Sequence, residues 1–194
     1  MSLRAFAAHV AYVAFAMLAP AATGWAQSGE TRTLDLEGGA RVAYMLRNHP
    51  PGAHLMRPDA ALSPDSALNA AKLLNLHLST GDLEEAALLS NAPRRRFEVL
   101  RDYRESVGEE EFKRVFAEYF FPENRLIAEI AIDRHRLLVW ELKGDGKSGA
   151  ASSRLAGQYF VEVEGRYLLD DVPNDQRTRL RWILEAYRSG KLAR

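Results

Sequence analysis

Two histidines and one run of arginines are the residues whose type and spacing first suggest chemistry. His49 and His54 lie on either side of Pro50-Pro51-Gly52, and imidazoles are common metal ligands. No third ligand accompanies them, and a proline-rich loop is not a rigid support for a metal ion. We therefore interpret both as solvated loop histidines and predict no metal site and no cofactor.

The densest basic run is Arg94-Arg95-Arg96, followed by Arg101 and Arg104. Such a run can dock an acidic partner or anionic lipid headgroups. Acidic residues at Glu98, Asp102 and Glu105 stand at helical pairing distance from it. A solvated helix face of mixed charge is therefore the favoured interpretation, and docking is the alternative.

Composition and missing motifs exclude several classes of protein. The chain of 194 residues has no cysteine, which excludes disulfides, thiolate metal sites, a cysteine nucleophile and lipid attachment at an N-terminal cysteine. Basic and acidic side chains both number 26, which argues against a general nucleic-acid binder. The sequence has no G-x-G-x-x-G, phosphate-binding loop, H-E-x-x-H or G-x-S-x-G motif.

Residues 1–26 have the pattern of a secretory signal peptide. Arg4 supplies the positive charge and Ala5 to Leu18 the apolar stretch, and Gly24-Trp25-Ala26 is a cleavage site of small residues. Ala19-Pro20-Ala21 is a second candidate cleavage site, and an uncleaved anchor is the alternative interpretation. The apolar stretch is short for a membrane span, so we expect a periplasmic or secreted protein that is not integral to a membrane after cleavage.

Residues 27–62 are expected to form an N-terminal hairpin and a proline-rich linker. Apolar and polar residues alternate on both sides of Gly38-Gly39-Ala40, which is suited to a tight turn. Pairing Leu36 with Val42, and Leu34 with Tyr44, matches apolar side chains across the two strands. The linker is expected to separate this hairpin from an α+β domain at residues 63–194.

Four helices are predicted in the first half of that domain. Ser63-Pro64-Asp65 has the residues of a helix start, and Thr80-Gly81 ends this helix. Further helices are expected to begin at Asp82, near Ala92-Pro93 and at Glu109. A fifth helix, capped by Asn174, is expected to run to about Ser189 near the C-terminus.

Strands fill most of the stretch from Arg125 to Asp171. Even-numbered residues are apolar from Leu126 to Ile132 and again in Leu138, Trp140 and Leu142, the period of a strand with one buried face. A three-residue turn then places Ile130 opposite Leu138, and Ala128 opposite Trp140. Two more strands, at 154–163 and 166–169, are joined by Glu164-Gly165. The prediction is an α+β fold in which helices pack on one face of a curved antiparallel sheet.

This order of elements resembles the NTF2-like (SnoaL-like) α+β cone over about Ser63–Val172. Gly81-Asp82 between two helices, and the hairpin Tyr159–Tyr167, are similar to the opening and closing elements of such domains. The final helix and the early hairpin depart from the family pattern. The resemblance implies a pocket between sheet and helices, which binds small molecules in some members, performs catalysis in others and mediates contacts in many.

If that pocket exists, aromatic side chains are expected to form its walls, and the alternative is that they fill the core. Enzymes of the family pair a carboxylate with a histidine or tyrosine. The nearest match here is Asp133 with His135, in a predicted turn whose chemistry also explains the aspartate. We therefore predict no catalytic residue. The expected ligand-binding residues are Phe116, Tyr119, Trp140, Tyr159, Phe160 and Tyr167.

The sequence thus predicts an exported, non-enzymatic domain that binds a small apolar or aromatic ligand, or a protein partner. One alternative is a small pocket enzyme (a hydrolase, isomerase or lyase) with an acid–base pair. The other is a structural protein that forms oligomers through the linker and the N-terminal hairpin.

Overall fold

The computed structural model describes residues 29–35, 41–53, 55, 57–58, 62–143 and 153–192. The signal peptide expected at 1–26 and the turn expected at 38–40 lie outside these residues. The strands are β1 (Glu30–Asp35), β2 (Arg41–Asn48), β3 (Arg125–Ile132), β4 (His135–Lys143), β5 (Ser153–Val163) and β6 (Arg166–Leu169). The helices are α1 (Ala67–Thr80), α2 (Leu83–Leu88), α3 (Pro93–Val107), α4 (Glu109–Ala117), a short 3-10 helix (Glu118–Phe120) and α5 (Asp175–Arg188).

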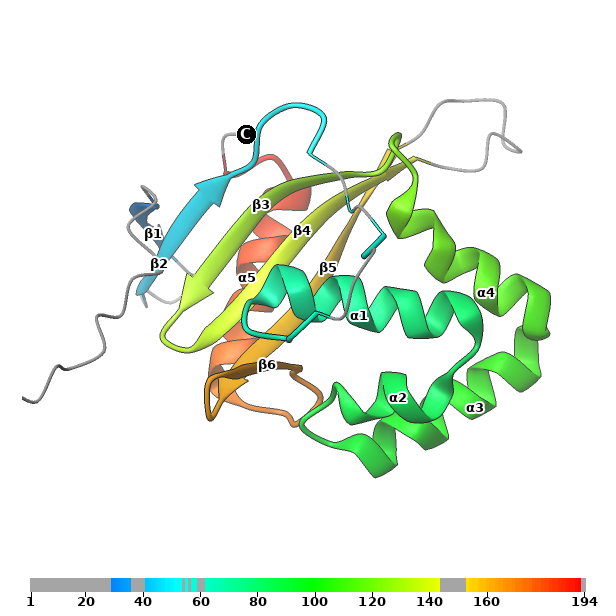
Figure 1. The fold of residues 1–194 in the computed structure, drawn as a ribbon. Coiled ribbons are helices and arrows are strands. Elements are labelled where there is room, and N and C mark those ends of the chain that lie inside the picture. The colour runs from blue at the N-terminus through cyan, green and yellow to red at the C-terminus, as the bar shows by residue number, and fades with distance from the viewer. Residues whose placement is uncertain are drawn as a thin grey trace, which may run out of the picture.

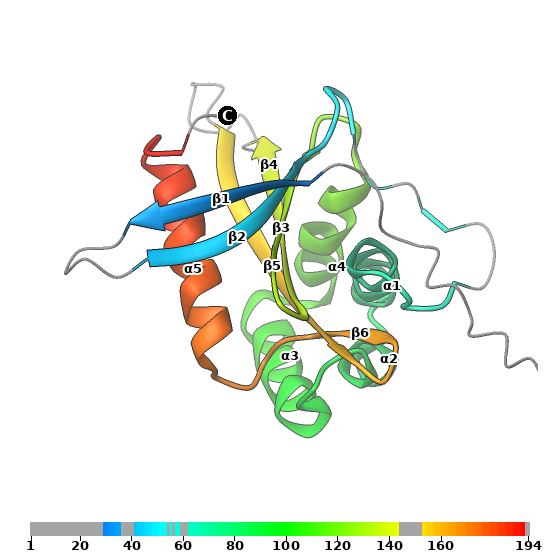
Figure 2. The same ribbon diagram turned by 90° about the vertical axis from the view of Figure 1, so that its left-hand side faces the viewer.

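The six strands form one antiparallel sheet in chain order (Figure 1). This confirms the predicted α+β fold. Helices α1 to α4 cover one face of the sheet, whereas α5 lies on the opposite face (Figure 2). The sheet is therefore a middle layer between α1 to α4 on one side and α5 on the other, and the prediction of helices on one face described only α1 to α4.

Strand β4 explains why both faces are covered. Its even-numbered residues pack toward α1 to α4, and Leu137 and Val139 pack toward α5. Leu137, Leu138, Val139 and Trp140 are all fully buried. A strand with apolar side chains on both faces needs a hydrophobic layer on each, so two cores form, one on either side of the sheet.

The predicted register of β3 and β4 is wrong. The turn has two residues, Asp133 and Arg134, because Ile132 pairs with His135; Asp133 adopts the left-handed conformation that this turn requires (φ 49°). Ile130 consequently lies opposite Leu137 instead of Leu138. An irregularity between Leu126 and Ala128 then places Leu126 opposite Trp140. Alternation alone could not fix this register because β4 is apolar on both faces.

The N-terminal hairpin is part of the main sheet. Its pairing is shifted by two residues from the prediction, since Leu34 lies opposite Val42. Strand β2 also pairs with β3, and the chain after β2 continues along β3 through hydrogen bonds from His49 N–H to the Ile127 carbonyl (2.9 Å) and from Leu126 N–H to the Ala53 carbonyl (2.8 Å). The expected separation of hairpin and domain is therefore absent in this part of the chain.

Helix α1 begins later than predicted, with Ser66 as its N-cap instead of Ser63. The preceding segment stays extended because the Pro64 carbonyl accepts the N–H of Tyr167 in β6 (2.7 Å). The end of α1 at Gly81 and the Asp82 cap of α2 are as predicted. The Asn174 cap of α5 is also as predicted. Within the described residues, no helix has the length and apolarity needed to cross a membrane.

A candidate anion-binding groove between α3 and α5

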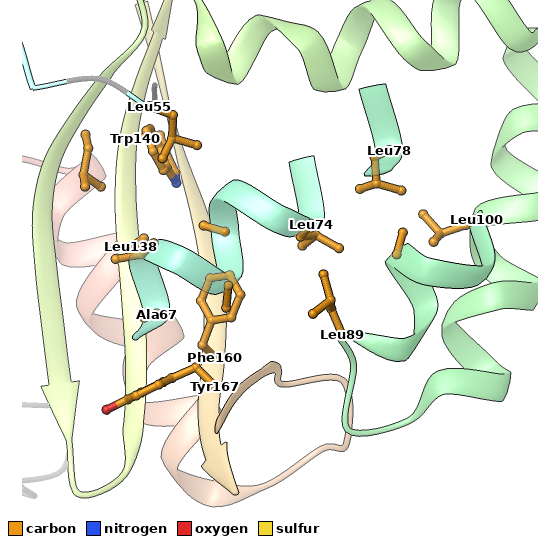
Figure 3. Packing of buried hydrophobic residues seen from close by; sticks show 14 of the residues in the cluster. Leu55, Ala67, Leu74, Leu78, Leu89, Leu100, Leu138, Trp140, Phe160 and Tyr167 are labelled. Atoms are coloured by element: carbon orange, nitrogen blue, oxygen red, sulfur yellow. The ribbon is translucent and has the colours of Figure 1, made fainter. Parts of the chain in front are cut away.

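Five of the six predicted ligand-binding aromatics belong to the core between the sheet and α1 to α4. Trp140 and Phe160 are fully buried and Tyr167 is nearly so; Figure 3 shows Trp140 beside Leu55, and Phe160 beside helix α1. The Trp140 ring meets the Tyr119 ring edge-on at 5.4 Å, and its indole N–H donates to Gln158 Oε1 (3.1 Å). These side chains contact one another where the expected pocket would lie.

Tyr159 is the exception because it packs on the α5 face. It also lines a concave site, a groove of about 430 Å³ between the N-terminal parts of α3 and α5. We call this the arginine groove. Figure 2 shows the connection from β6 to α5 passing beside α3. Its lining residues are Arg95, Arg96, Val99, Tyr159, Asp171, Pro173, Asn174, Arg177, Thr178 and Arg181.

The connection from β6 to α5 is tied to α3 through Asp171. This carboxylate accepts from the Ser90 hydroxyl (2.7 Å) and from Arg96 Nε (2.7 Å) and Nη2. Asn91 completes the contact, since its Oδ1 accepts the Asp171 N–H (2.8 Å). Charge-assisted bonds of this kind are stronger than neutral ones, so Arg96 is held in place as one wall of the groove.

Asp170, which is 1% exposed, fixes the start of α5. Its carboxylate accepts from the Asn91 side chain (3.0 Å) and from the Asn174 side chain (3.0 and 3.1 Å). Asn174 in turn caps α5 by accepting the Arg177 N–H (2.8 Å). Neighbouring aspartates therefore have separate roles, one for each helix that borders the groove.

His135 contacts Asp170, and not Asp133 as considered from the sequence. Its Nδ1 lies 3.0 Å from Asp170 Oδ2, and the imidazole is mostly buried. Asp133 instead accepts from the Gln176 side chain (3.0 Å). The prediction missed the pair of His135 and Asp170 because these residues are far apart in the sequence and meet only when β5 pairs with both β4 and β6.

The groove carries an excess of positive charge. Four arginines and one aspartate line it, and the aspartate is bound to Arg96. Among the described residues, Arg95, Arg177 and Arg181 have no carboxylate partner. Arg177 is placed by Tyr159, because its guanidinium lies over the phenol ring at 5.6 Å from the centroid.

Tyr159 remains a hydrogen-bond donor in this setting. Burial raises the pKa of its phenol, and nearby arginines including Arg188, Arg177 and Arg181 oppose the rise. The phenol is therefore protonated near neutral pH. The hydroxyl oxygen lies beside Gly157, where an added Cβ would be 3.5 Å from it, and near the side chains of Leu137 and Leu184.

The sequence indicated parts of this site without joining them. The sequence shows the dense basic run Arg94-Arg95-Arg96, but no local pattern relates it to Arg177 and Arg181 of the last helix. The mixed-charge interpretation holds for Arg94, which lies 3.7 Å from Glu98. It also holds for Arg101, which contacts Asp102 and Glu105. Arg96 instead contacts Asp171 outside the helix, and Arg95 is exposed and lines the groove.

A second groove, of about 830 Å³, borders the other side of α5. Its charges are balanced, with three basic and three acidic residues, and Trp182 in it is 43% exposed. We call this the hairpin groove. Its lining residues are Leu34, Asp35, Arg41, Val42, Asp175, Thr178, Arg179, Trp182, Glu185, Ala186, Ser189 and Lys191.

No cluster of metal-ligating side chains occurs among the residues that the structure describes; His54 lies outside them. Comparisons with models of protein families, with curated proteins and with solved structures give no match. The resemblance to NTF2-like domains therefore stays a prediction.

Proposed function

We propose that the chain is an exported, non-enzymatic domain that binds a small acidic ligand in the arginine groove. The observation that carries this proposal is the meeting of Arg95, Arg177 and Arg181, without carboxylate partners among the described residues, in one concave site. Guanidinium groups bind carboxylates in a planar, bidentate geometry. Export is the expectation from the signal-peptide pattern of residues 1–26.

The size and lining of the groove support binding. Small-molecule sites commonly enclose about 300 to 1,000 Å³, and the arginine groove has about 430 Å³. Its arginines supply charged hydrogen-bond donors, which favour an acceptor-rich ligand over an apolar one.

The chemistry of the lining supports a non-enzymatic role. The one carboxylate in it, Asp171, is occupied by Arg96 and Ser90, and the Thr178 hydroxyl donates to the Asn174 carbonyl (3.1 Å). An acid–base reaction requires a titratable pair directed at the substrate. The lining instead supplies donors that hold an anion.

The test is a titration of the purified chain with sodium glutarate at low ionic strength, followed by backbone amide chemical shifts. We expect the shifts to concentrate in residues 94–99 and 171–181. The double variant Arg95→Ser/Arg181→Ser should bind at least about tenfold more weakly, which corresponds to about 1.4 kcal/mol.

Arg179→Ser is the matched control, because Arg179 is also an exposed arginine of α5 but lines the hairpin groove. Its affinity should equal that of the parent chain. Equal weakening in the control and the double variant would show general charge attraction and overturn the proposal, as would an absence of binding.

A further inference from the structure

We propose that the acidic ligand is a small dicarboxylate that bridges α3 and α5; this inference rests on the proposed function. The groove has cationic residues on two walls that come from different helices. Arg95 belongs to α3, whereas Arg177 and Arg181 belong to α5. A ligand that contacts both walls therefore needs an anionic group at each end.

The two arginine-bearing walls indicate the number of charges on the ligand. A single carboxylate accepts two parallel hydrogen bonds from one guanidinium, so a monocarboxylate contacts one wall and leaves the other solvated. A second carboxylate on the same molecule meets the second wall as an intramolecular event, at a high effective concentration. Arginines on two walls thus favour a dianion with separated charges.

The apolar surface of the groove indicates what lies between the two charges of the ligand. Val99, Tyr159 and Pro173 contribute apolar surface to the groove, and Val99 is 51% exposed. A short hydrocarbon spacer would cover this surface and remove it from water. Inorganic phosphate has no such spacer and concentrates its charge at one centre.

Hydrogen bonds hold the two walls of the groove at a fixed spacing. Asp171 binds Arg96 of α3, and Asp170 binds Asn174, the cap of α5. Both helix starts are therefore held by adjacent residues of one connection, which fixes the spacing of the two walls before a ligand arrives. A preformed spacing selects one ligand length, because a mismatched ligand loses contact with one wall.

The experiment compares succinate, glutarate, adipate and pimelate with monocarboxylates of equal carbon number and with inorganic phosphate, near neutral pH and at fixed ionic strength. Calorimetry or amide shifts give each dissociation constant. We expect the best dicarboxylate to bind at least about tenfold more tightly than its matched monocarboxylate, with one optimum of spacer length. Arg95→Ser should reduce the dicarboxylate to the monocarboxylate level, and Arg179→Ser should change neither.

The remaining outcomes distinguish failure of the bridging inference from failure of the proposed function. Equal affinities for di- and monocarboxylates, or tighter binding of phosphate than of any dicarboxylate, would overturn the bridging inference and leave the proposed function standing. Loss of spacer-length dependence would also overturn it. If none of these anions binds, both proposals are wrong. Circular dichroism of each variant checks that an affinity change does not reflect unfolding.

Discussion

The two grooves that border α5 share one helix but differ in charge. The arginine groove has four basic residues and one acidic residue, whereas the hairpin groove has three of each. The hairpin groove is the larger, at about 830 Å³ against about 430 Å³. Judged by volume alone, the hairpin groove would be the ligand-binding site. Judged by unpaired charge, the site would be the arginine groove. Specific polar groups usually decide what a pocket binds, so we assign the ligand to the arginine groove.

The ion pairs in the two grooves also differ in burial. Arg96 and Asp171 have side chains that are 23% and 10% exposed, whereas Arg41 and Asp35 are 76% and 74% exposed. A mostly buried pair is costly to break because the remaining charge loses its partner in a poorly solvated place. An exposed pair contributes little because water and salt screen it. One pair organises its groove, and the other is a surface contact.

Asp171→Asn tests this difference and has the largest expected effect. It should lower the free energy of unfolding by about 2 to 3 kcal/mol, because Arg96 loses its carboxylate and Ser90 loses a charged acceptor. Asp35→Asn should cost less than about 0.5 kcal/mol. Urea unfolding followed by circular dichroism measures both. Similar losses in the two variants would contradict the assignment of a structural role to Asp171 alone.

Gly157→Ala tests how closely α5, which borders both grooves, packs on the sheet. A Cβ at this position in β5 would lie 2.7 Å from Leu184 Cδ2 and 2.8 Å from Leu137 Cδ1. Both leucines are buried, so α5 must shift away from the sheet, and we expect a loss of about 1 to 3 kcal/mol in unfolding free energy.

The matched control is Gly29→Ala, whose Cβ would lie 3.2 Å from the mobile end of the Met45 side chain. Its unfolding free energy should stay close to that of the parent chain. Because the shift of α5 would alter both grooves, Gly157→Ala should also weaken glutarate binding. A Gly157→Ala variant as stable as the parent chain would show that α5 packs less closely on the sheet than the contacts at Gly157 indicate.

Local signals in the sequence predicted much of the fold. Helix ends at Gly81 and Gly108, and the Glu164-Gly165 turn, depend on backbone conformations with positive φ that few residues adopt. Such signals act within a few residues and can be recognised without knowing the rest of the chain. The register of β3 and β4 could not be predicted in this way, because β4 is apolar on both faces and an irregularity changes the alternation of β3.

The candidate site could not be predicted because it depends on contacts between distant segments. Arg95, Tyr159 and Arg177 come from three elements, and no spacing rule connects them. One signal was available: alternation in β5 places Tyr159 and Phe160 on opposite faces, so these two residues could not line one pocket. The pairing of His135 with Asp170 likewise arises from sheet topology and from no local motif.

A change of pH is expected to alter the folding stability of the chain without altering its affinity for glutarate. The described residues that line either groove include no histidine. His49 lies elsewhere and is partly buried, so the prediction of a solvated loop histidine is wrong for it. Burial, followed by the nearby charge of Arg47, lowers the pKa of its imidazole to about 4. At His49 the folded state therefore binds fewer protons than the unfolded state between about pH 4 and 6.5, and the contribution of this group to stability falls as the pH is lowered through this range.

We expect this loss to be about 1 to 2 kcal/mol, after allowance for the partial exposure of the imidazole. Urea unfolding at a series of pH values measures it, and His49→Gln should remove most of the slope. Glutarate affinity, measured above the pKa values of the ligand itself, should stay constant because guanidinium groups remain charged. A slope that persists in His49→Gln would assign the proton uptake to another group.

Trp182 provides the test with the smallest expected effect. It is 43% exposed in the hairpin groove, whereas Trp140 is fully buried, so in a Trp25→Phe background acrylamide quenching of fluorescence reports mainly on Trp182. Saturating glutarate should leave this quenching unchanged, and Trp182→Phe should alter unfolding by less than about 0.5 kcal/mol. Protection of Trp182 by glutarate would place the ligand in the hairpin groove. Volume would then outweigh unpaired charge in deciding which side of α5 binds it.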